Sequence, residues 1–261
     1  MPAKSKTIVG MIHLLPLPGS PRYHGSLAAI RERALEDARA LAAGGVDAIV
    51  IENFGDAPFY PGRVPAHVVA HLTAVAAQVR AAIKVPLGIN VLRNDGISAL
   101  SIAHAVGAKF IRVNILSGAR VTDQGIIEGN AHELQRLRAE LGATSVRVYA
   151  DVDVKHSSPL GERRGIEDEV DDTIHRGLAD AVIVSGAGTG KATDLAKVKR
   201  VKMAAGDVPV YVGSGVTVKT VRQFLVQCDG VIVGTSLKVD GVATNAVDVK
   251  RVEAMMKAVG R

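Results

Sequence analysis

The chain has 261 residues, of which 48% are hydrophobic and 22% charged, with one cysteine and a formal net charge of +6. This apolar content excludes a disordered chain, and the single cysteine excludes a disulfide framework and a cysteine-based zinc cage. No apolar run approaches the roughly 20 residues that a membrane-spanning helix needs. We therefore expect a cytoplasmic protein that makes at most peripheral contact with a membrane.

The positive charge is compatible with nucleic acid, a membrane surface or an anionic metabolite as partner. Basic residues are scattered along the chain, apart from one cluster formed by Lys197, Lys199, Arg200 and Lys202. Because apolar residues are interleaved with them at helical spacing, this cluster predicts the solvated face of a helix. We therefore expect no nucleic-acid partner.

Short runs rich in valine and isoleucine alternate with amphipathic stretches along the whole chain. Continuous apolar runs bounded by Gly, Asp or Asn are typical of parallel strands covered on both faces. In chain order, the predicted strands are Thr7–His13, Asp47–Asn53, Pro86–Val91, Phe110–Asn114, Val146–Val154, Ala181–Ser185, Pro209–Gly213 and Gly230–Gly234.

Each predicted strand is followed by a stretch with helical periodicity, and most of these stretches end at a glycine. Eight strand–helix units without a linker predict an α/β fold, a single (β/α)₈ TIM barrel, with residues 1–261 forming one domain. A doubly wound sheet is the weaker alternative. The predicted helices are Leu27–Ala43, Pro65–Ile83, Asp95–Val106, Ala131–Leu141, Ile166–Arg176, Thr193–Ala205, Thr217–Val226 and Asn245–Val259.

The carboxyl ends of the strands carry the chemistry in barrels of this kind. Polar residues do end the first four predicted strands: His13, Glu52 with Asn53, Asn90 and Asn114. We expect His13 and the three asparagines to bind substrate, with loop capping as the alternative for Asn90 and Asn114. For His13, a proton donor, a metal ligand and a structural hydrogen-bonding group stay open.

Glu52 is the predicted general base, because partial burial raises the pKa of a carboxyl group toward neutrality. The alternative is a salt bridge with a loop arginine such as Arg93.

The fifth predicted strand ends in Ala150–His156 and is the most informative segment. Strand alternation places Asp151, Asp153 and Lys155 on one face and the two intervening valines on the other. The charged face should look into the barrel mouth, where charges are costly unless they pair, bind a metal or meet a polar ligand. We predict catalytic roles for Asp151, Asp153, Lys155 and His156, with a structural Asp–Lys ion pair as the alternative.

Three chemical roles follow for this segment. Asp151 is a second candidate base, and Lys155 or His156 would stabilise developing negative charge. Lys155 would form a Schiff base if its pKa is depressed. Asp151 and Asp153, with His13 or Glu52, offer an oxygen-rich site for Mg²⁺ or Mn²⁺, and no other cofactor is predicted.

The last three predicted strands end in glycine, serine and threonine. Glycine allows backbone amides to approach an anion, and the loops after strands seven and eight are the usual phosphate site of these barrels. Tight turns that require glycine are the alternative. We predict that a small phosphorylated substrate is bound by Ser185, Gly186, Gly213, Ser214, Gly215, Gly234, Thr235 and Ser236.

Residues 186–192 resemble a P-loop but do not match it. Ser185 stands at the first required glycine, and Ala192 follows Lys191 where Ser or Thr is required. We therefore reject a P-loop at this position.

Several strand-end segments resemble the BtpA/SgcQ family. The resemblance rests on Gly10–Pro21, Glu52–Phe59, Asn90–Asp95, Ala150–Pro159, Gly213–Thr217 and Val233–Lys238. It implies a TIM-barrel enzyme. Cyanobacterial members are linked to photosystem I biogenesis and thylakoid membranes, and SgcQ-like members to sugar uptake and metabolism, some with a nucleoside triphosphatase label. Similar proteins are named phosphoribosylanthranilate isomerase-like.

Together these patterns predict an isomerase or lyase that uses acid/base chemistry on a sugar phosphate or nucleoside phosphate. Two alternatives stay open: a non-enzymatic, membrane-associated assembly factor of the photosystem I type, and a phosphoribosylanthranilate isomerase-like enzyme. We also expect the protein to form a homo-oligomer.

Overall fold

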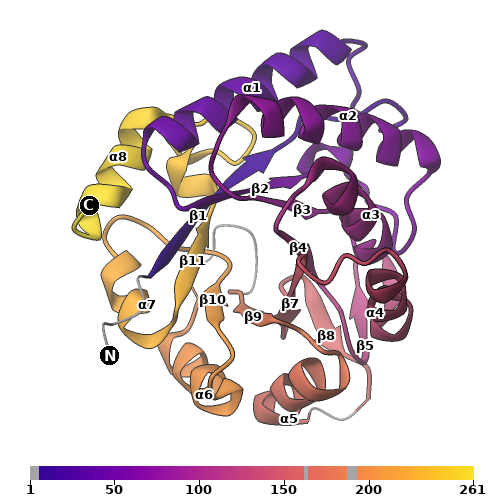
Figure 1. Cartoon of the computed structure of the whole chain (residues 1–261). Helices are drawn as coiled ribbons and strands as arrows, with labels where there is room; N and C mark the ends of the chain where they lie inside the picture. The colour runs from indigo at the N-terminus through magenta and orange to yellow at the C-terminus, as the bar shows by residue number, and fades with distance from the viewer. Residues whose placement is uncertain (1–5, 162–163, 187–192) are drawn as a thin grey trace.

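The computed structural model describes residues 6–161, 164–186 and 193–261. Eight parallel strands close into a barrel in the order β1-β11-β10-β9-β7-β4-β3-β2, and helices surround it (Figure 1). The predicted (β/α)₈ barrel is confirmed. Its strands are β1 (Thr7–His13), β2 (Ala48–Glu52), β3 (Leu87–Asn90), β4 (Phe110–Val113), β7 (Arg147–Val152), β9 (Ala181–Val184), β10 (Val210–Val212) and β11 (Gly230–Val233).

Local capping explains where several helices begin and end. The side chain of Ser26 accepts a hydrogen bond from the amide of Ala29 and starts α1, and Asp95 does the same for α3. α3 ends at Gly107, whose φ of 69° favours glycine. The helices are α1 (Leu27–Ala43), α2 (Ala66–Ala82), α3 (Gly96–Val106), α4 (Ala131–Glu140), α5 (Ile166–Asp171), α6 (Leu195–Ala205), α7 (Val221–Gln227) and α8 (Val249–Ala258).

The last two helices begin about four residues later than predicted. Hydrogen bonds between Thr217 and Thr220 form a turn before α7. The short 3₁₀ helices η3 (Thr235–Leu237) and η4 (Val239–Gly241) precede α8. No helix in the described part of the chain is both long enough and apolar enough to cross a membrane.

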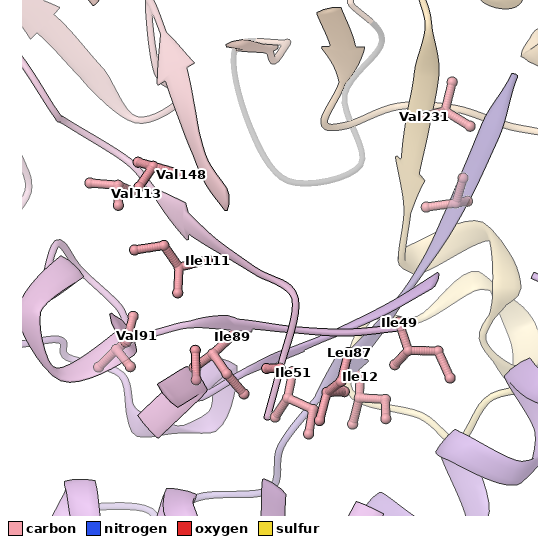
Figure 2. Close-up of a cluster of buried hydrophobic side chains, with 14 of the residues drawn as sticks. Ile12, Ile49, Ile51, Leu87, Ile89, Val91, Ile111, Val113, Val148 and Val231 are labelled. Carbon is pink, nitrogen blue, oxygen red and sulfur yellow. The ribbon is translucent and has the colours of Figure 1, made fainter. Parts of the chain in front are cut away.

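Strand alternation divides the apolar residues into two layers. One layer lies between the strands and the helices, and Figure 2 shows part of it, including Ile12, Ile49 and Ile89. The other fills the barrel interior, where Tyr149 stacks on Phe110 and Tyr211. These rings close the interior of the barrel. The inward-facing polar residues come later along the same strands and therefore lie at the carboxyl end of the barrel.

A small antiparallel sheet that the sequence did not predict lies beyond the barrel strands. Its order is β6-β5-β8, and two of its strands follow β4 while the third follows β7. Both insertions leave the carboxyl ends of barrel strands, so this sheet belongs to the same face as the polar strand ends. Its strands are β5 (Ala119–Thr122), β6 (Gly125–Glu128) and β8 (Ser157–Pro159).

Candidate active site

Strand register places four polar side chains side by side inside the barrel mouth. His13 is the register partner of Glu52, Glu52 of Asn90, and Asn90 of Arg112. Each lies two positions after a residue that faces the barrel interior, as His13 lies two positions after Met11. Because side chains alternate between the two faces of a strand, each of the four also faces inward. All four are buried. This row contains the predicted base, two predicted substrate-binding residues and one arginine that sequence reasoning missed.

A cavity of about 270 Å³ opens over this row. Arg112 and Arg251, which sequence reasoning did not select, line it, and both are cationic. The structure therefore joins the polar strand ends to the glycine-rich loops in one site. The predicted site residues that line the cavity are His13, Glu52, Lys155, Gly213, Ser214, Gly215, Gly234, Thr235 and Ser236.

His13 presents a lone pair to Glu52. Its Nδ1 lies 2.9 Å from the carbonyl oxygen of Ala243, which can only accept, so Nδ1 carries the proton. Nε2 lies 3.9 Å from Glu52 Oε1. Burial lowers the pKa of His13 to about 4, although the Glu52 carboxylate opposes the shift. At neutral pH two acceptors thus face each other, an arrangement suited to a donor such as a hydroxyl group and not to a histidine acid.

Asp151 is occupied by the side chains around it. Its two carboxylate oxygens accept hydrogen bonds from Arg112 Nε and Nη2, both at 2.8 Å. Asn114 Nδ2 donates to it at 3.1 Å and Ser185 Oγ at 3.0 Å. Bidentate pairing of this kind fixes a guanidinium in one orientation. The geometry therefore favours Asp151 as the residue that positions Arg112, and it forms an Asp–Arg pair where an Asp–Lys pair was the alternative.

Lys155 stands between Glu52 and two arginines. Burial lowers its pKa, the Glu52 carboxylate opposes this, and the Arg112 charge adds to it. A lowered pKa is the direction that a Schiff-base or proton-transferring lysine requires. The anticipated partner of Glu52, Arg93, instead donates from Nη2 to the carbonyl oxygen of Lys155 at 2.5 Å. The basic side chain that lies 3.9 Å from Glu52 Oε1 is that of His13, which carries no charge at neutral pH.

The prediction that Asp153 faces the barrel mouth is wrong. β7 ends at Val152, and Asp153 has a φ of 46°, so alternation does not continue to it. Its carboxylate accepts from Arg120 Nη2 at 2.6 Å and from Lys197 Nζ at 2.7 Å. It lines a different cavity, beside Glu169 and the small sheet.

Two further predictions change with this cluster. Lys197 was expected on a solvated helix face, but its ammonium group reaches back from α6 to Asp153. His156, at φ 58°, is exposed and lines a neighbouring cavity together with Arg93. Asp153 thus lies apart from the cavity that holds the glycine loops and Arg251, whereas His156 lines a cavity that shares Glu52 and Lys155 with it.

The remaining predicted residues lie around the mouth. Asn53, which was expected to bind substrate, accepts from the Leu92 amide at 2.7 Å and donates to Asp56 at 3.0 Å, so its side chain ties loops together. Asn90 is fully buried, and neither polar atom of its side chain has a hydrogen-bond partner among the described residues. Gly186 donates its amide to Ser214 Oγ at 2.7 Å. The rest of the rejected P-loop, residues 187–192, lies outside the described residues.

The anticipated Mg²⁺ or Mn²⁺ site is not assembled by this part of the chain. Within residues 6–161, 164–186 and 193–261, no three His, Cys, Asp or Glu side chains are placed to hold a metal ion. Asp151 and Asp153 point to different cationic partners, Arg112 and Arg120. The two carboxylates expected to share a cation therefore serve separate ion pairs.

The loops after β10 and β11 are joined to each other. Ser236 Oγ donates to the carbonyl oxygen of Val216 at 2.7 Å, and Gly215 has a φ of 71°, which favours glycine. Arg251 of α8 reaches the same cavity, with its Nε 3.8 Å from Asp248. Backbone, hydroxyl and guanidinium donors therefore surround this end of the cavity, a combination that suits an anion.

The profile of the BtpA family matches residues 4–261. The chain belongs to the BtpA family. It is 50% identical over 251 residues to the photosystem I biogenesis protein BtpA of Synechocystis, covering 96% of this chain and 87% of that protein. It is 34% identical to the putative sgc region protein SgcQ of Escherichia coli, covering 97% and 94%. The resemblance found in the strand-end segments is confirmed.

Solved TIM-barrel structures are similar in fold at low sequence identity. Phosphoribosyl anthranilate isomerase from Thermus thermophilus superposes with a TM-score of 0.58 and 14% identity, covering 97% of this chain and 98% of that one. KGPDC from Streptococcus mutans superposes with a TM-score of 0.61 and 13% identity, covering 98% and 97%. At this identity the likeness establishes the barrel and leaves the chemistry to the site itself.

Proposed function

We propose that this BtpA-family protein is an enzyme that acts on a small phosphorylated metabolite by isomerase or lyase chemistry. One observation carries the proposal: a single cavity is lined by Glu52, Lys155 and both glycine-rich loops. A carboxylate and a lysine on one wall, with anion-binding backbone on the other, are the parts that proton transfer on a phosphate ester needs.

Each residue has a defined task in this proposal. Glu52 abstracts the proton from substrate, while the neutral His13 accepts a hydrogen bond from a substrate hydroxyl group at the 3.9 Å gap between them. Lys155 and Arg112 stabilise the negative charge that develops, and Asp151 holds Arg112 in place. The loops at Gly213–Thr217 and Gly234–Ser236, with Arg251, bind the phosphate.

The charge of the cavity supports an anionic substrate. Lys155, Arg112 and Arg251 line it together with Glu52, while Asp151 pairs with Arg112 from behind and Asp248 lies 3.8 Å from Arg251. Burial keeps His13 neutral, so it adds no charge at neutral pH. Three cationic side chains therefore line the same cavity as the glycine loops, where a phosphate would be bound.

Thermal unfolding with and without ligand tests this function. We expect sugar phosphates or nucleoside phosphates to raise Tm by more than inorganic phosphate does, because a ligand at 100 times its Kd stabilises by about 2.7 kcal/mol. The variant Glu52→Gln should keep this shift and lose turnover of the stabilising compound, by about 10²–10⁴-fold. The exposed variant Glu167→Gln is the control for both readouts. If no phosphorylated compound exceeds inorganic phosphate, the proposal fails.

A non-enzymatic assembly role is the second candidate, because the Synechocystis relative is named a photosystem I biogenesis protein. An assembly factor does not require a charged cavity bordered by glycine-rich loops, whereas in this protein both Glu52 and Lys155 line such a cavity. Full complementation of a cell lacking its BtpA-family protein by Glu52→Gln would favour this candidate over the enzyme. The expected homo-oligomer stays a prediction.

A further inference from the structure

A second cavity adjoins the first at the two residues that the proposed reaction depends on. It has a volume of about 250 Å³, and Glu52 and Lys155 line both cavities. Together the two volumes fall within the ~300–1,000 Å³ that small-molecule sites occupy. A substrate whose reacting centre lies between Glu52 and Lys155 would therefore extend one end to the glycine loops and the other into this second cavity.

The second cavity has an apolar and aromatic wall, unlike the first. Phe54, Ala57, Phe59 and Leu92 line it. The chain contains only four phenylalanines, so half of them lie at this one site. Phe54 already stacks on His13, with ring centroids 4.4 Å apart, which leaves Phe59 as the aromatic residue available to a ligand. A wall of this kind suits a planar ring more than a hydrated sugar.

Charged groups at the rim determine what kind of ring fits. Arg22, Arg93 and Asp123 contribute both donors and acceptors to the cavity. Burial lowers the pKa of Arg93, and the carboxylates of Asp151, Asp123 and Glu52 oppose this shift. Arg93 Nε has no hydrogen-bond partner within the described part of the chain. A neutral ring with hydrogen-bonding heteroatoms matches this rim, whereas an anionic ring would meet the carboxylate of Asp123.

We propose that the second cavity binds the base of a nucleoside 5′-monophosphate whose phosphate lies at the Gly213–Thr217 and Gly234–Ser236 loops. The inference rests on the proposed function and narrows its substrate class, since a sugar phosphate alone would leave the second cavity unused. The sugar then lies between Glu52 and Lys155, where the two cavities meet.

Binding measurements on matched ligands test the inference. Ribose 5-phosphate and the four common nucleoside 5′-monophosphates are titrated into the full chain by calorimetry, together with Phe59→Ala and the control Tyr60→Ala. Tyr60 is the neighbouring aromatic residue, half exposed, and it lines a different cavity. We expect at least one nucleotide to bind wild type at least tenfold more tightly than ribose 5-phosphate. Phe59→Ala should reduce that advantage to threefold or less without changing ribose 5-phosphate binding, and Tyr60→Ala should keep it.

The outcomes separate this inference from the function on which it rests. If ribose 5-phosphate binds as tightly as every nucleotide, the inference is overturned while the phosphate site stands. The same holds if Phe59→Ala weakens both ligand types equally. If neither ribose 5-phosphate nor any nucleotide binds, the proposed function fails and the inference falls with it. An unfolded Phe59→Ala protein is replaced by Phe59→Leu, which keeps apolar volume and removes the aromatic face.

Discussion

The two halves of the barrel mouth are built in opposite ways. At the ends of β1–β4 and β7, the inward positions carry large polar side chains, such as Glu52 and Arg112, fixed by register and ion pairing. At the ends of β10 and β11, the corresponding inward positions are Gly213 and Gly234, with no side chain. One half offers functional groups, and the other offers space and backbone amides.

Packing explains why the second half is glycine. A Cβ atom at Gly213 would lie 2.5 Å from Ile183 Cγ2, 2.9 Å from Ser185 Oγ and 3.2 Å from Arg112 Nη2. A Cβ atom at Gly234 would lie 3.1 Å from His13 Cε1. Real side chains do not pack at 2.5 Å, so Ile183 excludes a side chain at Gly213, while Arg112 and His13 of the polar half crowd the two glycine positions at 3.2 and 3.1 Å. The two halves are therefore one packing unit.

The ion pair of the polar half should show the largest effect on stability. Replacing Asp151 by Ala leaves the Arg112 guanidinium buried without its partner, and breaking a buried pair in this way costs about 3–5 kcal/mol. The free energy of unfolding in urea measures it. The control is Glu167→Ala, which removes an exposed pair with Arg200 and should change stability far less, because solvent screens that pair. Equal losses in the two variants would mean that the Asp151 pair does not hold the polar half together.

His13 should make the polar half sensitive to acid. Its pKa is about 4 in the folded protein and near 6.5 when unfolded. Above pH 6.5 the group is neutral in both states and has no effect. As the pH falls from 6.5 to 4, the unfolded chain takes up a proton that the folded protein excludes, so stability is lost. The loss from this one group should reach roughly 2–3 kcal/mol near pH 4.5.

The variant His13→Gln isolates this contribution. Its unfolding free energy should fall less than that of wild type between about pH 7.5 and pH 4.5, because the carboxyl groups that also titrate are common to both proteins. Urea unfolding at the two pH values measures the difference. Parallel losses in the two proteins would show that the folded protein protonates His13 as readily as the unfolded chain does, which would contradict the lowered pKa.

Much of this architecture could be predicted from sequence because it depends on local pattern. Each apolar run had to be a strand buried on both faces, and residues ending those runs, such as Glu52 and Asn90, had to gather at one end of the barrel. The sheet β6-β5-β8 was missed because its strands are only three or four residues long and largely exposed, so they carry no apolar pattern.

The missed site residues had weaker signals or none. Arg112 had a signal in the sequence: it lies two residues before Asn114, so strand alternation places both side chains on the same, inward face. The orientation predicted for Asp153 was wrong because alternation holds only while the strand continues, and the backbone leaves the strand at this residue with a φ of 46°. Lys197 and Arg251 reach the strand ends from helices by tertiary packing, which no local spacing encodes.

Of the three predicted effects on the free energy of unfolding, the one in the glycine half should be the smallest. Its test decides whether the two halves depend on each other. Replacing Gly213 by Ala forces Ile183 and Ser185 to move, and overpacking of this kind costs about 1–3 kcal/mol of unfolding free energy. Gly62→Ala is the matched control, because a Cβ there meets nothing within 4 Å and should change stability by less than about 0.5 kcal/mol. If Gly213→Ala keeps full stability and only weakens phosphate binding, then this glycine serves the ligand alone and the halves are independent.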